Sequence, residues 1–554
     1  MRATSPASQL PDVEPGDRAL TVALLVAIVL GAVVRGWHIL GVDFPLNDGG
    51  LFLEMVRDLQ RAQYRLPAFT SYNDARIPFG YSPFAFYVTA VLNDLTGVSL
   101  FTLFRVLPLV VSTACIPAFY LLARELLPSR RALAAAVIAF AVIPRGFVWL
   151  LMGGGLTRSF GYLFALLTLH QLWRLYTGPS LRPVPLAALF AALTVLSHLG
   201  TAPFVAFSAV LFLLVRGRHW QAVIGSALAG AGALVLTAPW WASVMARHGV
   251  APFLAAQATG GSSISSLPDG MPDSLPDTGE RLLGALEHFA RDNTGEGWFP
   301  FFFALAVLGT IWCIRKRTLL LPAWWVAILV LDVRAGFTYA TAPVAMLAGI
   351  SAAHMFWPLL ASRTPSGRSR VPRWSAAASF TALLLLAIVG AASRRHDFDG
   401  ETRVLRALSP EHRLAMRWIA DNTSPTSQVL VLSDGPWQLD KFSEWLPVIA
   451  ARPSVATVQG SEWLPAGSFD SFIERQRRVN DCARGDTSCL DALRAEPTLR
   501  FTHVYAPVGP RDACCGPLVD ALRQDPRFAL VFENTAAQVY EWSPVTASAR
   551  WVVP

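Results

Sequence analysis

The residue best placed to do chemistry is Asp48, in the segment FPLNDGG at residues 44–50. It follows an apolar run at residues 19–41 that is long enough to cross a bilayer. An ionisable side chain at a membrane boundary needs a partner, a metal ion or a catalytic role. If the loop faces outside, Asp48 can act as a general base on a substrate at the bilayer surface. The structural alternative is that Asp48 caps a helix beginning at Gly49.

Further polar residues lie in the first loop or near the ends of apolar runs and could bind an anionic substrate. They are Arg76, Tyr81, Arg145, Arg158, His198 and Arg334. One carboxylate with several arginines suits an anionic ligand, because guanidinium groups pair with phosphate and carboxylate. The alternatives are that the arginines only reach toward the interface and that His198 only satisfies a backbone group. A divalent cation stays an open cofactor, with Asp48 as its candidate ligand.

The elements that must position these residues are membrane helices. The chain is 53% hydrophobic and only 15% charged, with a mean hydropathy of +0.42, whereas soluble domains carry about 25% charged residues. This composition and the long apolar runs predict a polytopic α-helical membrane protein that has membrane lipids as partners. The net charge of +8 comes from arginines in short loops between the runs. Such loops are typical of a cytoplasmic membrane face, so no nucleic-acid partner is expected.

We read about eleven apolar runs as spans, which make a transmembrane domain at residues 19–393. They lie at about 19–41, 100–123, 132–150, 156–173, 183–198, 201–215, 220–243, 298–313, 318–333, 337–360 and 375–393. The positive-inside rule puts residues 1–18 in the cytoplasm, and the loops 42–99 and 247–297 and the C-terminal tail outside. This orientation requires residues 80–97 to form a helix along the outer surface without crossing, because a crossing there would invert every later loop.

Residues 394–554 are predicted to form an extracytoplasmic α/β domain. A helix is expected after Ser409, and β-rich runs lie at 428–432, 454–458, 501–505, 528–532 and 538–542. Four of the six cysteines fall in this tail, where disulfides would persist. Cys482 with Cys489 is one plausible pair, although spacing leaves the connectivity open. The cysteine spacing matches no common zinc pattern.

The tail also contains a short internal repeat, because SEWLP occurs at 443–447 and again at 461–465. An exposed tryptophan beside a carboxylate would suit sugar binding, since the aromatic face stacks on a pyranose ring. Alternatively, both copies start helices and pack their tryptophans inside.

This layout resembles the GT-C superfamily of membrane glycosyltransferases, which includes protein O-mannosyltransferases, aminoarabinose transferases and oligosaccharyltransferase catalytic subunits. The resemblance is carried by Asp48 after the first span, the segment GYSPF at 80–84, the multi-span core and the external α/β domain. It implies a sugar on a polyprenyl phosphate or diphosphate as donor, Asp48 as the residue that binds or deprotonates the acceptor, and Arg334 as a contact of the donor phosphate. The chain departs from oligosaccharyltransferases, because the second external loop has no Asp-x-Asp or Glu-x-Asp pair and the tail has no Trp-Trp-Asp signature.

The resulting functional prediction is a glycosyltransferase of a bacterial inner or plasma membrane. It would move a sugar from the polyprenyl-linked donor to a glycan, lipid or protein acceptor at the external face. The alternatives are a transporter or flippase for a lipid-linked or anionic solute, and a catalytically silent scaffold of the same fold. A transporter predicts paired inverted repeats, and no convincing half-to-half repeat is found.

Overall fold

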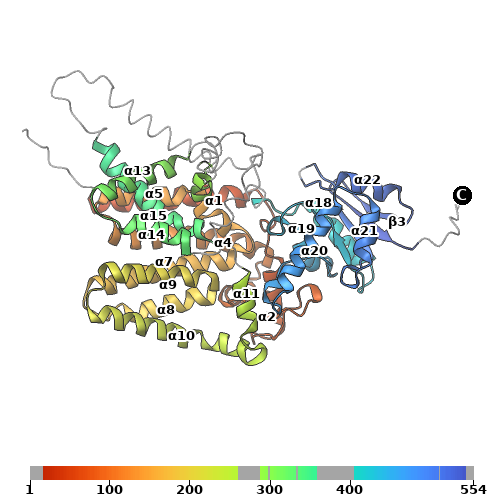
Figure 1. Cartoon of the computed structure of the whole chain (residues 1–554), viewed down its shortest axis with the longest axis horizontal. Coiled ribbons are helices and arrows are strands. Elements are labelled where there is room, and N and C mark those ends of the chain that lie inside the picture. Colours follow the sequence, from red (N-terminus) through yellow and green to blue (C-terminus); the bar gives the residue numbers. More distant parts are fainter. Residues whose placement is uncertain are drawn as a thin grey trace, which may run out of the picture.

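The chain forms a helical domain followed by a smaller α/β domain at one end of it (Figure 1). The computed structural model describes residues 16–259, 287, 289–296, 300–331, 335–358, 405–510 and 512–544. The α-helices of the first part are α1 (Asp17–Leu40), α2 (Gly50–Arg61), α3 (Phe84–Thr96), α4 (Leu100–Leu126), α5 (Arg130–Val142), α6 (Val148–Leu151), α7 (Gly155–Thr177), α8 (Val184–Ser197), α9 (Ala202–Arg216), α10 (Trp220–His248), α11 (Ala251–Ala258), α13 (Phe301–Arg315), α14 (Leu320–Leu331) and α15 (Gly336–Ser351).

Where its residues are described, each predicted span up to residue 360 overlaps helices of this domain, although the span 132–150 is divided between α5, the 3₁₀ turn Pro144–Gly146 and α6. Within the described residues, five helices are long and apolar enough to cross a membrane. A sixth joins them if α5 and the segment Pro144–Leu151, which are bent by 73°, count as one span. The last predicted span, 375–393, lies outside the described residues, so the count of about eleven stays a prediction.

Small residues let the membrane helices approach closely around α15. Every residue of α15 is buried, and α15 packs against α5, α13 and α14. A Cβ on Gly349 would meet the Ala132 carbonyl oxygen at 2.3 Å, and one on Gly309 would meet the Leu347 carbonyl oxygen at 2.0 Å. Both contacts therefore require glycine, as close helix–helix packing in membranes commonly does.

Helix α3 is tied at its end to the first loop. At its start, the Ser82 hydroxyl accepts a hydrogen bond from the Leu199 amide at 3.1 Å. At its end, Asn93 and Asp94 both accept from the Gln60 side chain of α2, each at 2.7 Å. That residues 80–97 do not cross the membrane stays a prediction.

The tail domain is built on a four-stranded mixed sheet. The strands are β1 (Val429–Val431), β2 (His503–Pro507), β3 (Phe528–Glu533) and β4 (Ala537–Trp542), in the order β1-β2-β4-β3. β1 and β2 are parallel, with Val429 opposite His503, and the remaining pairs are antiparallel. The helices around the sheet are α18 (Pro410–Asn422), α19 (Lys441–Ala450), α20 (Ser468–Cys482), α21 (Thr487–Arg494) and α22 (Gly516–Gln524).

Four of the five predicted strands are confirmed, whereas the run 454–458 is not a strand. It makes only one isolated parallel bridge, between Ser454 and Val429. The Ser454 amide instead donates to the Asn73 side chain at 2.7 Å, and the Thr457 hydroxyl donates to the Ser443 carbonyl at 2.9 Å. The Asn73 side chain thus occupies the backbone amide and carbonyl of Ser454, which a longer strand would use for pairing.

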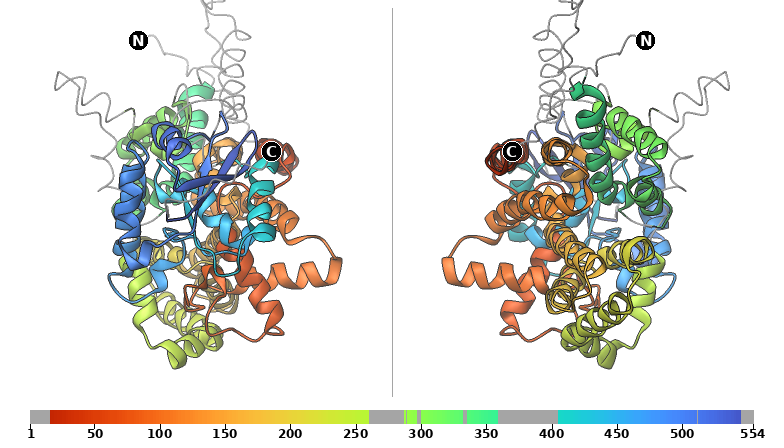
Figure 2. Two further views of the ribbon diagram at one scale, coloured as in Figure 1. Left: turned by 90° about the vertical axis from the view of Figure 1, so that its right-hand side faces the viewer. Right: turned by 90° about the vertical axis from the view of Figure 1, so that its left-hand side faces the viewer.

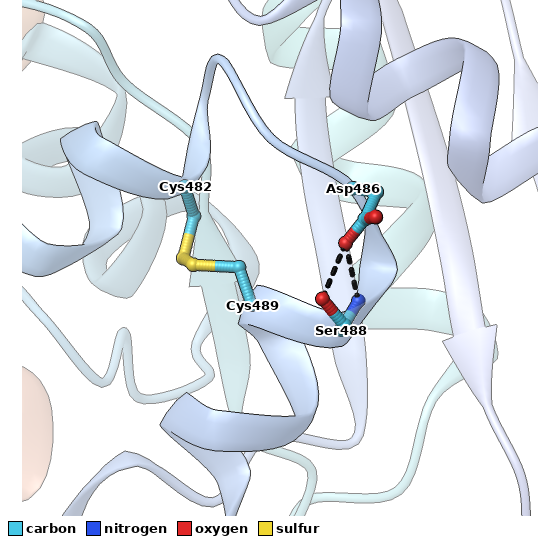
Figure 3. Close-up of a disulfide and its surroundings, with 4 residues drawn as sticks. All are labelled: Cys482, Asp486, Ser488 and Cys489. Carbon is cyan, nitrogen blue, oxygen red and sulfur yellow. Dashed lines mark hydrogen bonds between the residues drawn. A yellow bond between two sulfur atoms is a disulfide. The ribbon is translucent and has the colours of Figure 1, made fainter.

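Cys482 and Cys489 form the predicted disulfide, with their Cα atoms 5.6 Å apart. Figure 3 shows this bond joining the end of α20 to α21, whose first turn is capped by Asp486 through hydrogen bonds from the Ser488 amide and hydroxyl. The neighbouring residues Cys514 and Cys515 form a second disulfide, which the sequence analysis does not anticipate.

The tail domain and the first loop share one hydrophobic core. Trp445 is fully buried, and its ring lies 4.6 Å from that of Phe44. Leu46 makes an antiparallel bridge with Ala407, and the Asn47 amide donates to the Arg406 carbonyl at 2.9 Å. The tail therefore packs on the first loop, which carries Asp48, and Figure 2 (left) shows the tail domain in front of the helical domain.

Candidate active site

Asp48 is held against the turn that precedes α7. Its Oδ1 atom accepts a hydrogen bond from the Gly154 amide at 2.8 Å, and the Gly153 amide donates to the Leu46 carbonyl at 2.9 Å. A Cβ on Gly153 would lie 2.0 Å from the Asp48 carbonyl oxygen, and one on Gly154 would lie 2.4 Å from the Asp48 carboxylate. The glycine triplet at 153–155 is therefore explained by the close approach of this loop.

Asp48 does not cap the following helix, so that alternative is wrong. α2 begins at Gly50 with no side-chain cap from its own segment. Glu444 of the tail supplies the missing acceptor, because its Oε1 accepts from the Gly49 amide at 2.8 Å and from the Leu51 amide at 3.4 Å. A carboxylate at a helix N-terminus is also favoured by the helix dipole.

The surroundings of Asp48 and Glu444 differ in charge. Burial raises the pKa of Asp48, while the Arg158 guanidinium and the Gly154 amide oppose that rise. Burial and the nearby charge of Asp48 raise the pKa of Glu444 to about 8. The Arg158 cation opposes the rise at Asp48, whereas backbone amides alone oppose it at Glu444.

Arg158 stands in the first turn of α7, one residue after Thr157. Its guanidinium carbon lies 5.7 Å from the centre of the Trp149 ring. Its Nη1 atom is buried without a hydrogen-bond partner in the described part of the chain. A buried guanidinium nitrogen without a protein acceptor is suited to an anionic ligand group.

The second SEWLP copy meets the first loop at Tyr81. The Tyr81 hydroxyl donates to the Glu462 carboxylate, and the Tyr81 and Trp463 rings lie 4.8 Å apart. Burial raises the pKa of Glu462 to about 7. Trp463 is only 5% exposed and Trp445 is fully buried, so stacking of a sugar on exposed tryptophans is wrong and inward packing is confirmed.

Tyr81 and His198 border a common pocket together with Thr157, Ser197, Ala256 and Trp463. The pocket is formed where the start of α3, the first turn of α7, the turn after α8 and helix α11 meet. A ring nitrogen of His198, Nδ1, lies 2.9 Å from the Thr201 hydroxyl, which lies 2.7 Å from the Tyr339 hydroxyl. This chain fixes the orientation of the imidazole at the pocket wall.

The remaining predicted residues do not join these groups. Arg76 is exposed, with its guanidinium 5.2 Å from the centre of the Phe69 ring. Arg145 lies 5.4 Å from the centre of the Phe337 ring on α15. Neither is among the groups that shift the pKa of Asp48. Arg334 lies outside the described residues. The structure therefore groups Asp48 with Arg158 and Tyr81 with His198.

Glu444 and Glu462 are the site residues that the sequence analysis missed. The only signal for them was the repeated motif that contains both glutamates. Their partners in the first loop are 395 and 381 residues away in sequence, so no local pattern could connect them.

The described residues do not form a site for a divalent cation. No group of three or more His, Cys, Asp or Glu side chains gathers anywhere in them. Asp48 has one carboxylate nearby, and Oε1 of that Glu444 already accepts backbone hydrogen bonds. Oxygen-ligated cations require more donors than this pair offers, so no step of the reaction below is assigned to a metal.

Comparison with known proteins supports the predicted resemblance. Residues 80–242 match the model of the dolichyl-phosphate-mannose-protein mannosyltransferase family. A comparison with curated protein sequences gives no match.

Several solved structures share the fold. The oligosaccharyltransferase AglB from Archaeoglobus fulgidus, in complex with an inhibitory peptide and a dolichol-phosphate, superposes with a TM-score of 0.59 at 14% identity, over 97% of this chain and 75% of AglB. ArnT from Cupriavidus metallidurans bound to undecaprenyl phosphate gives 0.51 at 15% identity, over 95% of this chain and 98% of ArnT. The mycobacterial arabinofuranosyltransferase AftD gives 0.55 at 16% identity, over 97% of this chain but only 41% of AftD. Residues 80–242 are therefore similar to that mannosyltransferase family, and the chain shares the fold of these membrane glycosyltransferases.

Proposed function

We propose that this protein transfers a sugar from a polyprenyl-phosphate-type lipid to an acceptor hydroxyl, with Asp48 as the general base. The observation that carries the proposal is the placement of Asp48 between the Gly154 amide and the charge of Arg158. AglB and ArnT were solved with dolichol-phosphate and undecaprenyl phosphate, and these bound lipids support a polyprenyl phosphate as the carrier.

In the proposed reaction Asp48 takes the proton of the acceptor hydroxyl. The acceptor oxygen forms a bond to the anomeric carbon while the bond from that carbon to the phosphate oxygen breaks. The transition state resembles an oxocarbenium ion, as in other glycosyl transfers. Arg158 stabilises the charge that develops on the departing polyprenyl phosphate. Glu444 positions Asp48 by holding the amides of Gly49 and Leu51.

The charge distribution along α7 supports an external site. Gly154 and Arg158 lie at the start of α7, and Arg174 lies in its last turn. At 1.5 Å per residue the helix is about 35 Å long, enough to separate the two membrane faces. Arg216 likewise ends α9, and Arg130 begins α5. Under the positive-inside rule this arginine-bearing end is cytoplasmic, and the Asp48 loop and the tail domain are extracytoplasmic.

The test is the turnover of radiolabelled polyprenyl-phosphate mannose by purified protein in nanodiscs, with native membrane extract as the acceptor source. Asp48→Asn should abolish transfer, because the amide cannot accept the proton. Arg158→Gln should lower the rate on the order of 10²–10³-fold, the usual effect of losing a preorganised charge-stabilising group. Asp74→Asn is the matched control, since Asp74 is exposed in the same loop. Near-normal turnover by Asp48→Asn would overturn the assignment of the base.

A further inference from the structure

A second pocket lies where the first loop, the start of α4 and the tail domain meet. Its volume is about 360 Å³, which falls within the range of about 300–1,000 Å³ typical of small-molecule sites. The polar groups of its wall come from three segments: the first loop contributes Asp43 and Arg57, the start of α4 contributes Ser99 and Thr102, and α18 of the tail contributes Arg413 and Arg417. None of these six residues takes part in the reaction proposed above.

The pocket carries an excess of positive charge. Among its described lining residues, Arg57, Arg413 and Arg417 are cations and Asp43 is the only acid. Asp43 accepts a hydrogen bond from the Arg413 Nη2 atom at 2.5 Å, and this bond lowers the pKa of Asp43. Arg57 pairs at 3.1 Å with Glu54, which does not line the pocket and has a second arginine partner. The wall therefore lacks an anion that a phosphate group of a ligand would supply.

The pocket also has hydrogen-bond donors to spare. The Arg413 side chain is only 11% exposed, and its Nε atom is buried without a hydrogen-bond partner among the described residues. Its guanidinium carbon lies 5.0 Å from the centre of the Phe44 ring. Arg417 follows four residues later on the same face of α18 and forms no hydrogen bond or ion pair with a described residue. The Ser99 and Thr102 hydroxyls lie 2.9 Å apart, so one of their two hydrogens stays available to a ligand.

The pocket lies at the ends of two candidate membrane spans. Helices α1 and α4 are both long and apolar enough to cross a bilayer. Asp43 follows the end of α1, whereas Ser99 and Thr102 lie at the start of α4. The apolar side chains nearby in sequence are exposed, Leu40 by 82% and Val98 by 38%. A ligand with an anionic headgroup in the pocket could therefore lay its hydrocarbon chains against the span ends, as a phospholipid does.

From this arrangement we propose that the pocket binds the phosphate headgroup of an anionic phospholipid and so docks the tail domain on the membrane surface. The headgroup accepts hydrogen bonds from Arg413 and Arg417 of the tail and from a hydroxyl at the start of α4. One lipid then joins the tail domain to a membrane helix. The inference does not rest on the proposed transferase function, because it uses neither Asp48 nor Arg158 and the lipid is not consumed.

The first experiment is native mass spectrometry of the full-length protein in detergent, which measures lipid binding without turnover. Phosphatidylglycerol and phosphatidylcholine with the same acyl chains differ in net headgroup charge, and we expect the first to bind at least about tenfold more tightly. Soluble glycerol phosphate has the same phosphate but no acyl chains, and it should bind more weakly than phosphatidylglycerol. Equal affinity for the two lipids, or for phosphatidylglycerol and glycerol phosphate, would overturn the proposal.

A polyprenyl phosphate offers similar chemistry, so the second experiment separates this pocket from the proposed donor site. We expect Arg158→Gln to lower the binding of undecaprenyl phosphate and to leave that of phosphatidylglycerol unchanged. If Arg158→Gln lowered the binding of both lipids equally, the pocket would belong to the donor site and the proposal would be overturned. A failure of the transferase assignment would leave the preference for phosphatidylglycerol in place, so the two proposals fail separately.

The third experiment removes charge from the pocket. Arg417→Gln and Arg57→Gln should each lower phosphatidylglycerol affinity about fivefold, the usual effect of one arginine near an anionic headgroup. Arg484→Gln is the matched control, because it removes an exposed arginine of the tail outside the pocket and should not change binding. Unchanged binding in folded Arg417→Gln and Arg57→Gln proteins would overturn the proposal.

The docking role is tested by thermal unfolding of the full-length protein in nanodiscs. Phosphatidylglycerol nanodiscs should give a higher unfolding midpoint than phosphatidylcholine nanodiscs, because a ligand that binds only the folded protein stabilises it. The difference should persist in Arg484→Gln and shrink in Arg417→Gln. Equal midpoints of the wild-type protein in the two lipids would overturn the docking role.

Discussion

The two SEWLP copies have the same five residues but different structures and partners. In the first, Asp440 caps the helix by accepting from the Ser443 amide at 3.1 Å, and α19 continues to Ala450. In the second, Gly460 precedes the motif without a side-chain cap, and only a short 3₁₀ turn, Ser461–Trp463, forms. The flanking residues, more than the motif itself, decide which element is made.

The copies also differ in how completely they are hydrogen-bonded. The Trp445 indole donates to the Asn47 carbonyl at 2.7 Å, and Glu444 accepts two backbone amides. Trp463 and one oxygen of Glu462 have no protein partner among the described residues. The first copy thus fixes the loop that carries Asp48, whereas the second leaves buried polar atoms without a partner among the described residues.

The largest expected contrast is between Glu444→Ala and Glu462→Ala. Removing Glu444 leaves the Gly49 and Leu51 amides without their acceptor and releases the Asp48 loop. A misplacement of about 1 Å costs on the order of 10²-fold in rate. Removing Glu462 frees only the Tyr81 hydroxyl, and a loss below about tenfold is expected. Steady-state transfer in nanodiscs measures both, and an equal loss in the two variants would contradict the contrast.

The disulfide Cys482–Cys489 lies downstream of the second copy, at the end of α20. Replacing both cysteines by serine should destabilise the tail domain by about 2 to 3 kcal/mol, through the added entropy of the unfolded chain. Transfer at low temperature should remain, since neither cysteine contacts the first copy. Thermal unfolding with and without reductant measures the stability. A loss of transfer in folded protein would contradict the expectation that the disulfide affects stability and not transfer.

A finer contrast compares Trp445→Phe with Trp463→Phe. The first leaves the Asn47 carbonyl buried and unpaired, because Asn47 is 1% exposed, and should cost about 1–3 kcal/mol. The second removes a donor that has no protein partner and should cost less than about 1.5 kcal/mol. Chemical denaturation of the two variants gives the difference, and the reverse order would show that the indole of Trp463 is the structural one.

The smallest effect is in the pH dependence of stability. Folding raises the pKa of both glutamates from 4.5, to about 8 for Glu444 and about 7 for Glu462. A carboxyl raised by folding stabilises the protein at low pH, and this contribution is lost as pH rises from its unfolded pKa to its folded pKa. Between pH 7 and 8 the loss then comes mainly from Glu444.

Glu444→Gln should therefore reduce the fall in stability between pH 7 and 8 by up to about 1.4 kcal/mol, whereas Glu462→Gln should change it by only about 0.4 kcal/mol. Midpoints of thermal unfolding across this interval provide the measurement. If Glu462→Gln instead removed the fall in stability between pH 7 and 8, the roles assigned to the two residues would have to be exchanged.

Local patterns in the sequence were enough to predict the helices, the mixed α/β tail and Asp48 as the leading candidate. Apolar runs specify membrane helices because their side chains can face lipid or pack against other helices. The contact between Asp48 and Gly154 could not be predicted, because the two residues lie 106 positions apart. The predicted strand at 454–458 failed for the same reason, since Asn73 competes for its backbone from another segment. Arg76 lies beside Phe69 and Arg145 beside Phe337, and Arg158 is the described arginine that acts on Asp48.

The contact between Glu444 and the Gly49 amide also implies an order of steps during synthesis and folding. The chain is synthesised from its N-terminus, so the loop that carries Asp48 leaves the ribosome long before Glu444, which lies 395 residues further on. During membrane insertion the Gly49 and Leu51 amides have no carboxylate to hold them. These two amides gain their acceptor only when the tail domain has folded against the first loop. On the proposed function, a chain truncated before Glu444 is therefore expected to lack transfer activity.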